Sequence, residues 1–128
     1  MTELRPIGLD HIVLVVADVE RSLAWYVDEV GGRPVRVEEW RAGEVFFPSV
    51  RLSDDSIIDL IAGERSGLNL DHLCVVVEPV DLDAVRDSGR FEVLDGPATR
   101  YGARGNGTSL YVRDPDGNTV ELRHYGQA

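Results

Sequence analysis

A short motif, Leu-Asp-His, occurs twice in this chain of 128 residues, and each copy opens an apolar, mostly β-branched run. Its two histidines, His11 and His72, lie 61 positions apart, and a second match at an offset of 62 gives each half a carboxylate, Asp59 or Glu121. Imidazole and carboxylate groups together suit divalent iron, manganese, zinc, nickel or cobalt, and two histidines with one carboxylate form the usual facial site of non-haem iron. The alternative is that each histidine is an ordinary residue at the start of a strand, bonded to a backbone carbonyl.

Strands must position these side chains, because the residues around each of them are apolar and β-branched. Successive residues of a strand point to opposite faces, so Glu121 shares a face with Arg123, whereas His124 points the other way and is not counted as a ligand. If a pseudo-twofold axis relates the two halves, the repeated positions converge on one site. The duplication therefore predicts that the histidines and carboxylates lie close together, which their separation in the sequence alone does not predict.

The hydrophobic and turn patterns predict an α+β fold in which each half has the order β-α-β-β-β. In the first half we expect strands over 7–16, 34–40, 45–52 and 56–61, a helix over 19–30 and a linker over 63–69. In the second half we expect strands over 70–77, 91–94, 108–113 and 118–125, with a helix over 82–88. The glycine-containing segment 96–107 predicts a mobile loop, and Asp114–Gly117 predicts the turn of the last hairpin. We expect Trp25 and Tyr26 to pack in the core.

Composition excludes several classes of protein. The length fits one domain, residues 1–128, built from a module over about 7–62 and another over about 68–125. A net charge of −10 argues against a nucleic-acid-binding surface and is compatible with a cationic ligand. The single cysteine excludes an internal disulfide framework, and no apolar run is long enough to span a membrane. We therefore expect a cytoplasmic protein.

Three stretches carry a resemblance to a known family: the first Leu-Asp-His strand, the helix with Ser22-Leu23-Ala24-Trp25-Tyr26, and the hairpin from Leu110 through Asp114-Pro115-Asp116-Gly117-Asn118 to Leu122. Together they resemble the vicinal oxygen chelate superfamily, which includes glyoxalase I, type I extradiol dioxygenases, methylmalonyl-CoA epimerase, fosfomycin-modifying enzymes and bleomycin-binding proteins. The segment from Gly96 to Asp116 also resembles small virulence-associated glyoxalase-like proteins. The resemblance implies paired β-α-β-β-β modules whose sheets curl around a metal-binding cleft.

By this resemblance His11, His72 and Glu121 match the three metal ligands of the dioxygenase and fosfomycin branches, and Glu121 is also a catalytic candidate. Asp59 falls where glyoxalase I has a glutamate, so it is a further candidate for ligation or catalysis. Aspartate is one methylene shorter, which weakens the likeness to glyoxalase I specifically. Around the site, we expect four side chains to contact substrate: Arg100, Tyr101, Arg104 and Arg123. For Arg123 the alternatives are that it pairs with a site carboxylate or simply ends its strand.

Three classes of function follow, of which the third is a metal-bearing scaffold without turnover. The first is a divalent-metal-dependent enzyme, dioxygenase-like or glyoxalase/isomerase-like, that chelates a small substrate through vicinal oxygens. The alternative is an antibiotic-binding protein like those of the bleomycin-resistance branch, for which the acidic charge would suit a cationic drug. That branch does not need the His-His-Glu set, so its presence favours the enzyme. The resemblance also implies a homodimer, and nucleic-acid and membrane partners are not expected.

Overall fold

The repeat in the sequence corresponds to two compact units in the computed structural model, which describes residues 2–64, 66–113 and 117–126. We call His11–Asp71 the N-terminal unit, and Met1–Asp10 with His72–Ala128 the C-terminal unit. The boundaries fall inside two strands, β1 (Pro6–Val16) and β5 (Leu70–Val77), which are the strands that open the two copies of the repeat. The predicted α+β class is confirmed.

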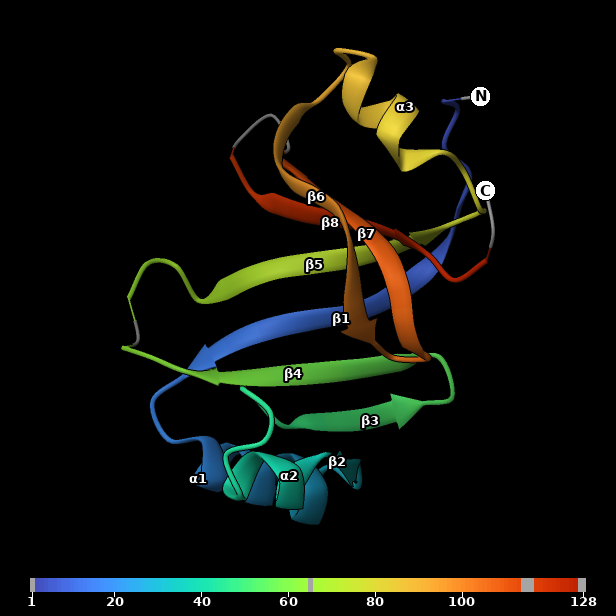
Figure 1. The fold of residues 1–128 in the computed structure, drawn as a ribbon. Helices are drawn as coiled ribbons and strands as arrows, with labels where there is room; N and C mark the ends of the chain where they lie inside the picture. Colours follow the sequence, from blue (N-terminus) through green and yellow to red (C-terminus); the bar gives the residue numbers. More distant parts are fainter. Residues whose placement is uncertain (1, 65, 114–116, 127–128) are drawn as a thin grey trace. The chain divides into compact units, whose positions relative to one another are not determined.

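Four strands of the N-terminal unit lie in the order β2-β3-β4-β1 (Figure 1). They are β2 (Arg33–Val35), β3 (Ser49–Ser53), β4 (Ser56–Ala62) and the part of β1 from His11 onward. β3 runs antiparallel to both β2 and β4, whereas β4 runs parallel to β1 and places Ile57 opposite His11. The parallel pair brings the last strand of this module beside its first.

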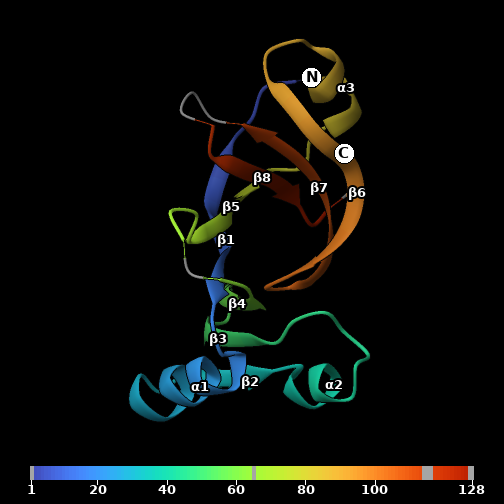
Figure 2. The same ribbon diagram turned by 90° about the vertical axis from the view of Figure 1, so that its left-hand side faces the viewer.

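Helix α1 (Val19–Ala24) continues into a π-helical turn, η1 (Trp25–Glu29), and a second helix, α2 (Val37–Arg41), follows β2. Both α1 and α2 lie on the same side of β3 and β4 in Figures 1 and 2. The Asp18 carboxylate caps α1 by accepting a 3.0 Å hydrogen bond from the Arg21 backbone N–H. The buried core of this unit consists of Val19, Leu23, Val50, Ile58 and Leu60.

The C-terminal unit has the strand order β5-β8-β7-β6. Its elements are β5, α3 (Leu82–Asp87), β6 (Glu92–Gly102), β7 (Gly105–Arg113) and β8 (Thr119–His124). β5 and β8 are parallel, and the other neighbours are antiparallel. The carboxylate of Asp81 caps α3, and the core of the unit consists of Val77, Val80, Leu82, Val85, Leu110, Val112 and Leu122. This is the predicted β-α-β-β-β order, again with first and last strands adjacent.

The predicted strand over 34–40 is wrong. β2 ends at Val35, and Arg36 has a left-handed backbone with φ of 58°, after which the chain turns into α2. Val37 and Trp40, three residues apart, both pack against the core, which is the spacing of a helix rather than a strand. The following hairpin also starts later than predicted, at Ser49.

The predicted mobile loop over 96–107 is wrong as well, since β6 and β7 form a long hairpin through this segment. Gly96, Gly102 and Gly107 lie where a neighbour approaches closely, whereas Gly105, with φ of 92°, lies at the turn of the hairpin. A Cβ atom on Gly107, for example, would come 2.9 Å from the His124 carbonyl oxygen. Glycine within a strand can mark such a close approach as well as a turn.

Tyr26 packs against the core as predicted, but Trp25 is 53% exposed. The predicted turn at Asp114–Gly117 lies, apart from Gly117, outside the described residues. Among the residues that the structure describes, no helix is long and apolar enough to cross a membrane.

Candidate functional site

In the C-terminal unit, the predicted pair of His72 and Glu121 is in direct contact. The Nε2 atom of His72 lies 3.0 Å from Oε1 of Glu121, with side-chain exposures of 14% and 1%. β5 supplies the histidine and its parallel neighbour β8 supplies the glutamate, with Cys74 opposite Glu121 in the register. The parallel pairing of the first and last strands of the module therefore brings an imidazole and a carboxylate together.

The N-terminal unit repeats this arrangement with a shorter acid. His11 Nε2 lies 3.8 Å from Oδ2 of Asp59, and both side chains are 2% exposed. The other oxygen of Asp59 accepts a 2.5 Å hydrogen bond from the hydroxyl of Ser49, the residue directly opposite on β3. Each unit thus buries one histidine beside one carboxylate.

Arg123 differs from the other predicted substrate-binding residues because its side chain is completely buried. Its Nε donates to Ser109 Oγ at 3.1 Å, and its Nη2 donates to the Arg100 carbonyl oxygen at 2.6 Å. The guanidinium also lies between two buried carboxylates, 3.5 Å from Asp10 Oδ2 and 3.4 Å from Glu121 Oε2. The prediction that Arg123 shares a face with Glu121 is therefore confirmed.

Sequence reasoning missed three members of this buried network: Asp10, Ser109 and Tyr125. The Ala103 backbone N–H donates to Asp10 Oδ2 at 2.9 Å, and the Tyr125 hydroxyl donates to Asp10 Oδ1. The signal for Asp10 was present, since the repeated motif contains an aspartate. Its counterpart in the second copy, Asp71, is exposed, so the repeat alone does not reveal which aspartate is buried.

Burial and charge shift the pKa values of the groups in this network. Burial raises the pKa of the Tyr125 hydroxyl, and its hydrogen bond to Asp10 raises it further. Burial alone would lower the pKa of Arg123, but the negative charge of Glu121 and the other partners outweighs it and raises the pKa. Arg123 is therefore a permanent cation inside the C-terminal unit.

Tyr111 and Arg100 lie beside the His72–Glu121 pair. The ring of Tyr111 packs edge-on against His72, with centroids 5.6 Å apart, and its own pKa is raised by burial and then by the charge of Glu121. The Arg100 guanidinium lies 5.9 Å from the centre of the Tyr111 ring and forms a 3.2 Å ion pair with Asp95. Arg100, one of the predicted substrate-binding residues, therefore contacts the Tyr111 ring, which in turn packs against His72.

Tyr101 and Arg104 lie on β6 and in the turn after it, respectively, rather than in a loop. The Arg104 guanidinium stacks 4.3 Å from the centre of the Tyr125 ring. Tyr101 is half-buried.

The donor set of the C-terminal unit fits a divalent cation. Two ligand atoms bonded to one ion at about 2.1 Å lie about 3 Å apart when the angle between them is close to a right angle. His72 Nε2 and Glu121 Oε1 lie at hydrogen-bond distance, 3.0 Å, and this separation is also compatible with two ligands of one ion. A neutral imidazole and a carboxylate suit first-row divalent ions.

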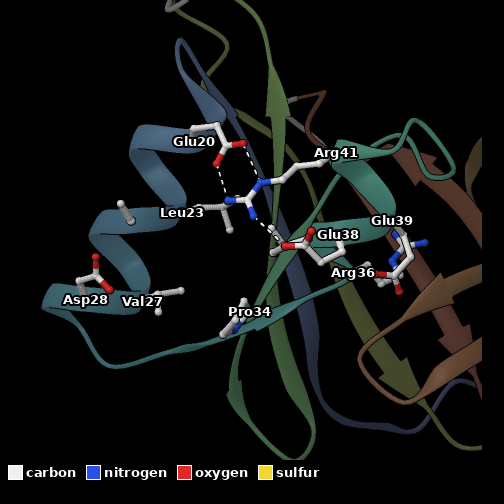
Figure 3. Close-up of a pocket in the computed structure, with 11 residues that line it drawn as sticks. Glu20, Leu23, Val27, Asp28, Pro34, Arg36, Glu38, Glu39 and Arg41 are labelled. Atoms are coloured by element: carbon white, nitrogen blue, oxygen red, sulfur yellow. Dashed lines mark hydrogen bonds and ion pairs between the residues drawn. The ribbon is translucent and has the colours of Figure 1, made fainter.

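A pocket of about 490 Å³ lies elsewhere in the N-terminal unit, between α1 and the β2–α2 segment (Figure 3). Leu23, Val27, Pro34 and Val37 contribute its apolar lining. Arg41 crosses it, with two hydrogen bonds to Glu20 at 2.8 and 2.9 Å and one to Glu38 at 2.8 Å. None of the predicted site residues lines this pocket, and two of its acidic residues, Glu20 and Glu38, are paired with Arg41.

Comparison with known proteins shows which superfamily the chain is similar to. Residues 8–68 match the model of the glyoxalase/bleomycin resistance protein/dioxygenase superfamily. Virulence protein STM3117 of Salmonella typhimurium is 28% identical over 91% of this chain and 83% of its own length. A probable lactoylglutathione lyase of Synechocystis is 28% identical over 88% of this chain and 91% of its own.

Among solved structures, the Mn(II)-bound glyoxalase from Novosphingobium aromaticivorans superposes with a TM-score of 0.73. It is 19% identical, and the alignment covers 98% of this chain but 41% of that one, so the likeness shows a shared fold alone. The family model and the two relatives point the same way: the chain is similar to the glyoxalase/bleomycin resistance protein/dioxygenase superfamily.

Proposed function

We propose that this protein is a divalent-metal-dependent enzyme whose substrate binds through two neighbouring oxygen atoms. The observation that carries the proposal is the His72–Glu121 pair, in which a partly buried imidazole and a buried carboxylate lie 3.0 Å apart, a separation compatible with two ligands of one ion. The match of residues 8–68 to the model of a superfamily named for glyoxalases and dioxygenases adds support. A glyoxalase of the same fold is Mn(II)-bound.

The proposed ligands are His11, His72 and Glu121. His11 joins the set on the strength of the repeat in the sequence and of the family resemblance. Two histidines and one carboxylate leave coordination positions open for substrate. We propose no fourth protein ligand, because Asp59 is one methylene shorter than the glutamate that the resemblance to glyoxalase I would require at this position.

When bound, the ion would accept two substrate oxygens and stabilise the negative charge that develops on them. Arg100, which lies over Tyr111, supplies a positive charge for an anionic substrate, and Tyr111 contributes an apolar wall. Tyr101 on β6 and Arg104 in the turn after it are further proposed substrate contacts. Asp59 is the proposed proton acceptor, since its Oδ2 faces His11 while Ser49 holds the other oxygen.

A substrate held through two oxygens can be isomerised, or opened by O2 if the ion is Fe(II). Oxygen uptake with a panel of catechols measures the second reaction. Isomerisation of glutathione–aldehyde adducts, followed by ultraviolet absorbance, measures the first. Turnover in one of these assays assigns the protein to that branch.

Metal analysis of protein purified without chelator tests the proposal. We expect about one divalent ion per chain in the native protein and none in His72→Ala. His124→Ala is the matched control: this histidine is also buried, on β8, but points to the opposite face from Glu121. Unchanged metal content in His72→Ala would refute the assignment. Metal-free native protein that binds a cationic antibiotic tightly would instead indicate a sequestering protein.

The homodimer predicted from the resemblance stays a prediction. Sedimentation equilibrium on the metal-loaded protein measures it directly.

A further inference from the structure

We propose that Arg123 and Ser109 are positioning residues that hold Glu121 so that it presents a single oxygen, Oε1, alongside His72. This inference rests on the proposed function, since it assumes that His72 and Glu121 bind the ion. In this proposal Arg123 orients Glu121 and does not contact substrate, although the sequence predicts a substrate contact.

First, every nitrogen of the Arg123 guanidinium donates a hydrogen bond to another group of the protein. Its Nε donates to Ser109, its Nη1 donates to the Tyr125 hydroxyl at 3.0 Å, and its Nη2 donates to a backbone carbonyl. With the side chain completely buried, a substrate has no surface of it to contact. A planar guanidinium whose nitrogens all donate hydrogen bonds is rigid, so it is suited to fixing the orientation of a neighbouring carboxylate.

The second step is that the two oxygens of Glu121 have different partners. Oε2 accepts a 2.7 Å hydrogen bond from Ser109 and lies 3.4 Å from Arg123 Nη2, whereas Oε1 is the oxygen that faces His72. Ser109 itself accepts from Arg123 Nε, so arginine, serine and glutamate form a relay of hydrogen bonds. This relay occupies Oε2 and leaves Oε1 as the ligand atom.

The third step is the contrast with the N-terminal unit. Asp59 also receives a serine hydrogen bond, from Ser49, but the residue two positions later is Ile61 where the C-terminal unit has Arg123. An apolar side chain cannot provide the charge or the second donor. In the repeat, the carboxylate that is followed two positions later by an arginine is Glu121, which is also the one that we propose as a ligand.

The experiment compares Ser109→Ala with the native protein and with Ser49→Ala. Each variant removes one serine hydroxyl from one repeated carboxylate, so the two are matched. Binding of Mn(II) alone is followed by calorimetric titration, and the electron paramagnetic resonance spectrum of the bound ion is recorded. The thermal midpoint of the metal-free protein is measured in parallel.

We expect Ser109→Ala to weaken Mn(II) binding by about 10- to 100-fold and to change the spectrum, as loss of a group that orients a ligand does. Ser49→Ala should stay within about twofold of native, and Ser109→Thr, which keeps the hydroxyl, should recover most of the affinity. If Ser109→Ala does not fold, Arg123→Lys provides the same test, because it keeps the charge but loses the fork.

Native affinity and spectrum in both Ser109→Ala and Arg123→Lys would overturn this inference while leaving the metal site intact. Equal losses in Ser109→Ala and Ser49→Ala would also overturn it, since the effect would then not be specific to Glu121. Native protein that binds no Mn(II), Zn(II), Fe(II), Ni(II) or Co(II) would overturn the proposed function and this inference together.

Discussion

Gly102 lies directly against the guanidinium of Arg123, so closely that a Cβ atom on residue 102 would overlap Nη1. The same Cβ would come 2.6 Å from Oδ2 of Asp10. Arg123 cannot swing away, because Ser109 and Tyr125 hold it by hydrogen bonds. Glycine is therefore required at position 102 by the packing of the buried ion pairs.

We expect Gly102→Ala to lower the free energy of unfolding by about 1–3 kcal/mol, the usual effect of overpacking a filled interior. Gly8→Ala is the control in the same unit, because nothing lies within 4 Å of its added Cβ. It should change the free energy by less than about 0.5 kcal/mol. Urea unfolding followed by circular dichroism measures both, and equal stabilities would show that the guanidinium moves more freely than its contacts imply.

Arg123→Met should destabilise the fold by about 3–5 kcal/mol, because it leaves the buried carboxylates of Asp10 and Glu121 without their cation. Arg86→Met, which removes an exposed arginine paired with Asp87, should leave the free energy of unfolding almost unchanged. Urea unfolding at neutral pH gives both values.

A second change checks the cause. Adding Asp10→Asn to Arg123→Met removes one of the two stranded charges, so part of the lost stability should return. No recovery would mean that packing, rather than charge, accounts for the effect of Arg123→Met.

The sequence predicted correctly those elements whose signals lie in neighbouring residues, such as an apolar run or a helix cap. The two apolar strands that follow Leu-Asp-His, the capped helices and the faces of Glu121 and Arg123 are as expected. The repeat was decisive here, since it related residues far apart in the chain. Each histidine then lies beside the carboxylate of its own unit.

Residues with two possible interpretations were predicted less well. Gly102 and Gly107 suggested a flexible loop, but they make room for Arg123 and for a backbone carbonyl, and neither neighbour is visible in local sequence. Ser109 looked like one polar residue of a strand. Its bond to Glu121 depends on how β7 pairs with β8, which only the folded unit establishes.

The Glu20–Arg41 ion pair at the N-terminal pocket predicts a local pH dependence. The hydrogen bond from Arg41 lowers the pKa of Glu20, with the arginine charge adding to the effect. Because the folded pKa is below the unfolded value, the stabilisation is present above the unfolded pKa and is lost as pH falls through the folded pKa. Carbon-detected NMR titration should show that Arg41→Gln raises the pKa of Glu20 toward its ordinary value.

Asp87 is the control for this titration, because its pKa is lowered by a hydrogen bond from a different arginine, Arg86. It should titrate identically in native protein and in Arg41→Gln. A Glu20 pKa that does not respond to Arg41→Gln would show that the ion pair is not maintained in solution.

The two repeated carboxylates should respond differently to loss of charge. Glu121→Gln is expected to weaken Mn(II) binding at least tenfold, because it replaces a charged ligand beside His72 with a neutral amide. Asp59→Asn should keep about one ion per chain but lose turnover, since Asp59 is proposed to accept a proton rather than to ligate. Calorimetric titration and the turnover assay separate these outcomes. If Asp59→Asn lost the metal as well, the short aspartate would be a fourth ligand, and the site would then resemble that of glyoxalase I after all.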